Sequence, residues 1–110
     1  MRYLITVFTL LLLSSTLFGD FVNGTVTCAA SGNKQMSATS YSLYQLTVTA
    51  APTNTGNVAI GGVSVTTSNA PLLAAGYSAN WTKPNAAINP ASLYIACTVS
   101  SDTIQWVGSR

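Results

Sequence analysis

The chain has 110 residues and a mass of 11.4 kDa, which is enough for one small domain. Apolar residues make up 48% of the chain and charged residues only 5%, far below the roughly 25% typical of globular proteins. This composition excludes a charge-driven disordered tail and a long exposed helix, both of which need many charged side chains. The polar surface must come from Ser, Thr, Asn and Gln, which favours strands and turns.

The charged residues are scattered, and the formal net charge is only +2. A nucleic-acid site needs clustered Lys and Arg to neutralise phosphates, so no nucleic-acid partner is expected. The chain contains no His and no Glu, which excludes a Ser-His-Asp or Cys-His catalytic arrangement. Two Cys and two Asp make an ordinary zinc site improbable, and phosphate-binding glycine motifs are missing. We therefore expect a protein that is not an enzyme, with no catalytic residue, metal ligand or cofactor.

Residues 1–19 differ in composition from the rest of the chain. Met1 and Arg2 precede a nearly continuous apolar run that ends at Leu13, and small polar residues follow it. This pattern is typical of a secretory signal peptide, and the run is short for a transmembrane helix, which needs around 20 residues. The alternative is a retained apolar arm that packs against a neighbouring subunit. We expect a single domain over residues 20–110, with membrane contact only through the N-terminal segment during export, if at all.

Residues 20–110 predict short strands separated by turn residues. The clearest strand is 41–50, where Tyr44, Leu46, Val48 and Ala50 share one face. About seven short strands at regular spacing predict an all-β fold, a small antiparallel β-sandwich or barrel. The other expected strands are 25–28, 57–60, 63–66, 77–81, 93–99 and 103–107. The expected core is Leu46, Val48, Ile60, Leu93, Ile95 and Ile104, and Leu72 and Leu73 are expected to be buried anchors of a loop.

Glycine and asparagine mark the expected turns. Asn54 and Gly56 belong to an Asn-Thr-Gly turn that ends the strand 41–50. Gly61 and Gly62 can supply the positive φ angles of a tight hairpin between strands 57–60 and 63–66. Gly76 is expected to turn the chain before the next strand.

Cys28 and Cys97 lie in the first and penultimate expected strands. In an exported chain they are expected to form a disulfide, with Cα atoms within about 7 Å of each other. In a cytosolic assembly the simpler expectation is two buried free thiols. The bridge would close a loop of about 70 residues and contribute about 4 kcal/mol in the chain-entropy model.

Four aromatic residues are candidates for an interface: Tyr77, Trp81, Tyr94 and Trp106. Alternating aromatics of this kind are expected in the core or between subunits, and the alternative is a carbohydrate-stacking platform. Asn23-Gly24-Thr25 and Asn80-Trp81-Thr82 match the N-glycosylation motif, which matters only in a eukaryotic secretory pathway.

From Ser40 onward, turn and strand motifs follow one another in a characteristic order. They are Asn54-Thr55-Gly56, Val58-Ala59-Ile60-Gly61-Gly62, Val65-Thr66-Thr67-Ser68, Leu72-Leu73, Ala75-Gly76-Tyr77-Ser78, Leu93-Tyr94-Ile95 and Ile104-Gln105-Trp106. This order resembles a family of small all-β proteins of tailed bacteriophages, comprising head decoration, head fibre and minor structural proteins. The chain departs from the family pattern at Ala59, where an aromatic residue is usual, and at Ala75, where proline is usual.

The resemblance implies a non-enzymatic bacteriophage virion structural protein that decorates or cements the capsid or acts at the head–tail region. Its implied partners are the major capsid protein or other virion subunits, with the chain homo-oligomeric or bound to the lattice. The alternative, favoured by the signal-like N-terminus and the two cysteines, is a secreted or periplasmic bacterial β-sandwich binding module of the adhesin or envelope type.

Overall fold

The computed structural model describes residues 20–30 and 32–110 and contains eight strands. The predicted signal peptide, residues 1–19, lies outside the described residues. The elements are β1 (Phe21–Thr27), β2 (Asn33–Gln35), β3 (Gln45–Ala50), β4 (Val58–Gly61), β5 (Leu72–Leu73), β6 (Ser78–Thr82), the 3₁₀ helix η1 (Pro90–Ser92), β7 (Tyr94–Cys97) and β8 (Thr103–Ser109). Within these residues no helix is long and apolar enough to cross a membrane.

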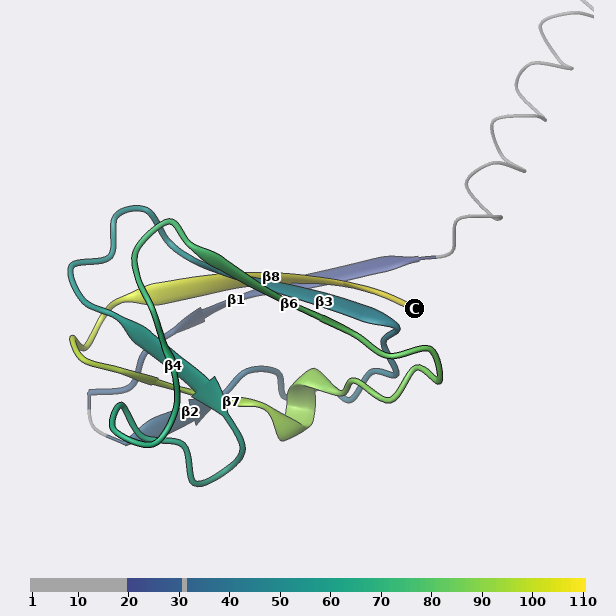
Figure 1. Cartoon of the computed structure of the whole chain (residues 1–110), viewed down its shortest axis with the longest axis horizontal. Coiled ribbons are helices and arrows are strands. Elements are labelled where there is room, and N and C mark those ends of the chain that lie inside the picture. The colour runs from purple at the N-terminus through teal and green to yellow at the C-terminus, as the bar shows by residue number, and fades with distance from the viewer. Residues whose placement is uncertain (1–19, 31) are drawn as a thin grey trace, which may run out of the picture.

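The strands form two four-stranded antiparallel sheets, which Figure 1 shows as two layers. Sheet A has the order β1-β8-β3-β6 and sheet B the order β2-β7-β4-β5. Each strand of the first half pairs with its mirror strand in the second half: β1 with β8, β2 with β7, β3 with β6 and β4 with β5. The chain is therefore one long antiparallel ribbon, rolled so that β8 also pairs with β3 and β7 with β4. This connectivity is that of a jelly roll, and the predicted β-sandwich is confirmed.

The core lies between the two sheets, because alternate side chains of each strand point inward. In β3 the residues Leu46, Val48 and Ala50 are fully buried, and each is flanked by a more exposed polar residue. A shift of one residue in register would move this apolar set to the solvent side, so the pattern specifies the register. Other buried members are Val26, Cys28, Met36, Leu43, Val58, Ile88, Ile95, Ile104 and Trp106.

The predicted core is confirmed for Leu46, Val48, Ile95 and Ile104. Ile60 and Leu93 are only partly buried and pack against the margin of this core.

The strand predicted over 41–50 is shorter than expected and begins at Gln45. Strand alternation would place Leu43 on the same face as Gln45 and Thr47. Leu43 is instead fully buried, whereas Tyr44, expected on the face of Leu46, is 48% exposed. Leu43 instead forms an isolated bridge with Ile88, with hydrogen bonds of 2.8 and 3.2 Å. Its side chain lies against Gly108, where a Cβ atom would collide with it. Pairing with Ile88 therefore places Leu43 in the core, against the inward–outward alternation of the neighbouring strand.

The tight hairpin predicted at Gly61 and Gly62 is wrong. Gly61 ends β4, Gly62 begins a loop over residues 62–71, and neither glycine has a positive φ. The expected partner strand 63–66 is part of this loop, and β4 pairs with β5 instead. Leu72, expected to be buried, is 47% exposed because β5 is the outermost strand of sheet B.

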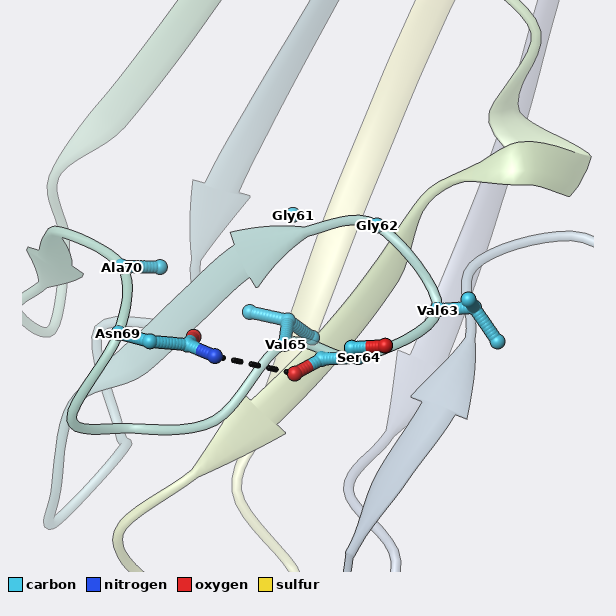
Figure 2. A pocket seen from close by; sticks show the side chains of 7 residues that line it. All are labelled: Gly61, Gly62, Val63, Ser64, Val65, Asn69 and Ala70. Carbon is cyan, nitrogen blue, oxygen red and sulfur yellow. Dashed lines mark hydrogen bonds between the residues drawn. The ribbon is translucent and has the colours of Figure 1, made fainter.

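The loop over residues 62–71 covers the part of the outer face of sheet B around Ala59 and Ala96 (Figure 2). Val65 is 6% exposed and packs on Ala59 and Ala96, two small side chains on the outward side of the sheet. Asn69 holds the loop closed: its Nδ2 donates to the Ser64 carbonyl at 3.1 Å, and its Oδ1 accepts from the Thr66 amide at 2.8 Å. The loop leaves a hollow of about 450 Å³ beside Val65. The loop therefore covers the sheet through the buried side chain of Val65.

Candidate interaction surfaces

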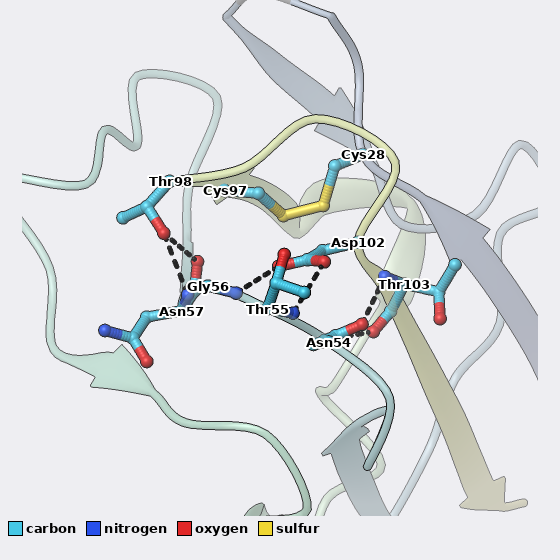
Figure 3. The surroundings of a disulfide bond; sticks show 9 residues. All are labelled: Cys28, Asn54, Thr55, Gly56, Asn57, Cys97, Thr98, Asp102 and Thr103. Atoms are coloured by element: carbon cyan, nitrogen blue, oxygen red, sulfur yellow. Dashed lines mark hydrogen bonds between the residues drawn. A yellow bond between two sulfur atoms is a disulfide. The ribbon is translucent and has the colours of Figure 1, made fainter.

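A disulfide joins the two sheets at one end of the molecule (Figure 3). Cys28 directly follows β1 of sheet A, and Cys97 is the last residue of β7 in sheet B. Their Cα atoms are 6.1 Å apart, within the range of natural disulfides. The predicted bridge is therefore confirmed.

The Asn54-Thr55-Gly56 turn is tied to the β7–β8 loop beside the disulfide (Figure 3). The Asn54 carboxamide donates to the Thr103 carbonyl at 2.8 Å and accepts from the Thr103 amide at 2.9 Å. The carboxylate of Asp102, only 5% exposed, accepts from the amides of Thr55 at 3.1 Å and Gly56 at 2.8 Å. Two backbone donors satisfy this buried carboxylate, so Asp102 serves to hold two loops together.

Gly56 is required in this turn by close packing. A Cβ atom at this position would collide with Thr98 Oγ1 and would lie 2.7 Å from a methyl group of Val99. Val99, the last residue of the expected strand 93–99, lies beyond β7 and is 38% exposed. In the described part of the chain, no three His, Cys, Asp or Glu side chains gather where they could hold a metal ion.

One side of the sandwich exposes apolar side chains along two edge strands. We call residues 71–82 the β5–β6 edge, because β5 is one of the two edge strands of sheet B and β6 one of the two edge strands of sheet A. Leu72 is 47% and Tyr77 67% exposed, and the segment contains no charged residue. Gly76 has a φ of +81° and forms the predicted turn before Tyr77. Edge strands without charged residues are open to pairing with another chain.

The four predicted aromatics do not form one platform. Tyr77 and Trp81 lie on the β5–β6 edge, where Trp81 packs partly against the core. Tyr94 packs against the small cluster under the loop of sheet B. Trp106 points into the core, 5% exposed, with its ring centroid 6.1 Å from that of Tyr41. A carbohydrate-stacking platform made of these four residues is therefore wrong, since they face different ways.

The indole of Trp106 packs under a glycine of β1. A Cβ atom at Gly24 would lie 2.6 Å from Trp106 Nε1. This buried Nε1 has no hydrogen-bond partner among the described residues. Gly24 therefore makes room for the largest side chain of the core.

No described residue outside the strands covers the outer face of sheet A, and its outward strand positions carry no charged side chain. Strand alternation and the register place Asn23 opposite Val107, Val107 opposite Thr47, and Thr47 opposite Asn80, in one row across all four strands. The next row is Thr25, Gln105, Thr49 and Ser78. The remaining outward positions are Phe21, Thr27, Gln45, Thr82, Thr103 and Ser109. Apart from Phe21 and Val107, all these side chains bear hydroxyl or carboxamide groups.

Two adjoining hollows make a trough along β8 on this face. The larger, of about 300 Å³, is lined by Gly24 and Trp106 and by outward side chains of β1, β8 and β3: Asn23, Thr25, Gln105, Val107, Thr47 and Thr49. The smaller, of about 120 Å³, shares Thr47 and Val107 with it and reaches Phe21, Gln45 and Ser109. Phe21 is 69% and Val107 42% exposed. We call this feature the sheet A trough.

Hydrogen bonding differs between the two halves of this face. On the β3–β6 side, Thr47 Oγ1 donates to Asn80 Oδ1 at 2.6 Å, and the hydroxyls of Thr49 and Ser78 lie 2.7 Å apart. On the β1–β8 side, the side chains of Asn23, Thr25 and Gln105 make no hydrogen bond to any other described residue. Among the described residues, these three side chains are therefore unpaired.

The sequence analysis noted Asn23 and Thr25 only as part of a glycosylation motif and did not select the other residues of this trough. The expected strand 103–107, with Ile104 in the core, already implied that Thr103, Gln105 and Val107 face outward. The sequence alternation could not show that β8 lies between β1 and β3, which brings Phe21 and Asn23 beside Val107.

Comparison with protein-family models, with curated proteins and with solved structures yields no match to this chain.

Proposed function

We propose that the chain is a non-enzymatic structural protein of a bacteriophage virion, bound to the capsid or at the head–tail region. The observation that carries this proposal is the jelly-roll strand order, an architecture that viral capsid proteins use. Jelly rolls also serve as lectins and cupins, so the fold leaves several functions open. The motif order from Asn54 to Trp106, which resembles phage decoration proteins, favours the virion among them.

The β5–β6 edge is the surface best suited to a protein partner. It combines exposed Leu72 and Tyr77 with the partly buried Trp81, and protein interfaces are enriched in aromatic residues and depleted of charge at their centre. It also presents two outer strands, whose free backbone groups can pair with a strand of a neighbouring subunit. The low charge of the chain leaves little repulsion between copies in a dense array.

Mass spectrometry of purified virions and co-sedimentation of the full-length chain with empty capsids test this proposal. We expect the protein in virions and in the capsid pellet. Tyr77→Ala combined with Leu72→Asp should weaken capsid binding at least tenfold, because both changes remove exposed apolar contacts of the edge. Tyr44→Ala is the matched control, since Tyr44 is 48% exposed and lies outside this edge. Equal binding by both variants would contradict an attachment through the β5–β6 edge.

The second candidate is a secreted or periplasmic binding module. The disulfide between Cys28 and Cys97 favours it, because such bridges persist in oxidising compartments. Absence of the protein from virions, together with its recovery from the host periplasm or medium, would replace the virion proposal with this one.

A further inference from the structure

The outer face of sheet A has the chemistry of a site for a neutral, hydroxyl-rich ligand. Its outward positions carry no formal charge. At one end of the face, Asp20 and Arg110 are paired with each other at 3.5 Å, and the exposed Lys83 follows Thr82 of β6. A phosphate, a nucleic acid or a sulfated polymer would need cationic side chains here. An uncharged ligand matches this electrostatic neutrality.

The free polar groups of the trough suit sugar hydroxyls. Each carboxamide of Asn23 and Gln105 offers one acceptor oxygen and two donor hydrogens, and the Thr25 hydroxyl both donates and accepts. A sugar hydroxyl likewise donates and accepts, so neighbouring hydroxyls of one ring can pair with one carboxamide. These three side chains make no hydrogen bond elsewhere in the described structure, so binding would break no existing contact of the protein.

The apolar groups of the trough suit the other surface of a sugar ring. Val107 lies in both hollows, and the exposed ring of Phe21 lines one end. The C–H face of a pyranose packs against apolar and aromatic surfaces of this kind. The trough follows β8 from Gln105 to Ser109, a distance of about 13 Å at the usual rise per residue, which suits an extended chain of sugars better than a single compact molecule.

A protein partner fits this face less well than a glycan. The centres of protein interfaces are enriched in aromatic residues, Met and Arg and are depleted of Ser. Binding energy there comes from a few large buried anchors. Outside Phe21 and Val107, this face has only hydroxyl and carboxamide side chains.

From this arrangement we propose that the sheet A trough binds a neutral polysaccharide. Asn23, Thr25 and Gln105 provide its hydrogen bonds, Val107 its apolar floor, and Phe21 a stacking ring at one end. The inference does not depend on the virion function, because the β5–β6 edge and the sheet A trough are different surfaces. A virion protein and a secreted module could each use it.

Native affinity electrophoresis of the purified full-length chain tests the proposal. The gels would contain soluble β-glucan, galactomannan or dextran as neutral probes, and alginate as an anionic probe. We expect at least one neutral polysaccharide to retard the protein and alginate not to do so. Retardation by alginate alone, or by none of the neutral polysaccharides, would overturn the proposal.

Variants locate the binding to the trough. Asn23→Ala combined with Gln105→Ala, and separately Val107→Asp, should weaken retardation at least tenfold, and Phe21→Ala should weaken it several-fold. Thr27→Ala is the matched control, because Thr27 is an exposed outward residue of β1 that does not line the trough. Near-UV circular dichroism of each variant checks that the fold is retained. Equal loss in the control, or unchanged binding in folded trough variants, would contradict the assignment.

Discussion

The two sheets of this jelly roll treat their outer faces in opposite ways. Sheet B presents Ala59 and Ala96 outward, and the loop over residues 62–71 covers them by placing Val65 on top. Sheet A presents mainly hydroxyl and carboxamide side chains outward, and within the described residues two shallow hollows lie over them. The segment that the sequence predicted as part of a short hairpin is instead this loop, which covers part of sheet B.

The chemistry of the outward residues accounts for this difference. Small apolar side chains gain from removal of water, at roughly 25 cal/mol for each Å² that is buried. Hydroxyl and carboxamide groups are well hydrated when exposed and would need partners if they were covered. Sheet B therefore gains stability from its cover, whereas sheet A can remain open without cost. The face without a described cover is the one for which we propose ligand binding.

The largest expected contrast is between the inner and outer residues of a single strand. Leu46 of β3 is fully buried, so Leu46→Ala should lower the free energy of unfolding by about 4–5 kcal/mol, the upper part of the usual range. Its neighbour Thr47 faces outward and hydrogen-bonds only across the exposed surface. Urea denaturation of Leu46→Ala and Thr47→Ala measures the difference in the free energy of unfolding. A cost below about 1 kcal/mol for Leu46→Ala would place the core elsewhere.

The next largest effect is expected from removal of the disulfide that joins the two sheets. Replacing Cys28 and Cys97 together by Ala should lower the free energy of unfolding by about 4 kcal/mol, because the bridge closes a long loop in the unfolded chain. The denaturation midpoint of the oxidised wild type, compared with the double variant, gives this value. As a control, a reducing agent should shift the wild type toward the variant and leave the variant unchanged. A reductant-insensitive wild type would contradict the bridge.

Sequence reasoning predicted the central strands well and the margins poorly. In 45–50 and 103–107 the alternation of apolar and polar residues is set by burial of one face, so it can be seen locally. At Val63 and Val65 the same β-branched residues predicted a strand, yet Val65 is buried by packing on another strand without any pairing. The strand β2 consists of Asn33, Lys34 and Gln35, and its polar sequence carried no strand signal.

The trough was hidden from sequence reasoning for a related reason. Phe21 and Asn23 come from the start of the domain, and Gln105 and Val107 from its end. They meet only because the rolled ribbon places β1 beside β8. Long-range pairing of this kind has no local signature, whereas the disulfide could be predicted because two cysteines admit only one intramolecular pairing.

A third prediction tests whether the loop of sheet B is a true cover. Val65→Ala removes two methyl groups from a buried site and should cost about 1–2 kcal/mol. It should also increase cleavage within residues 62–71 in limited proteolysis, because the loop loses its apolar contact with the sheet. Val63→Ala is the control, since Val63 belongs to the same loop but is 66% exposed. Equal effects of the two variants would mean that the loop is not anchored through Val65.

The smallest effect is expected on the open face, and it separates a binding surface from a supporting one. Gln105 is exposed at the centre of sheet A, and its side chain makes no hydrogen bond to another described residue. Gln105→Ala should therefore change the free energy of unfolding by no more than about 0.5 kcal/mol, as is usual for surface substitutions. Thr47→Ala should cost slightly more, up to about 1 kcal/mol, because it removes the bond to Asn80. Urea denaturation of the two variants under identical conditions measures both values. A loss above about 1.5 kcal/mol in Gln105→Ala would show that the β1–β8 half of the face supports the fold, and its polar groups would then no longer count as free for a ligand.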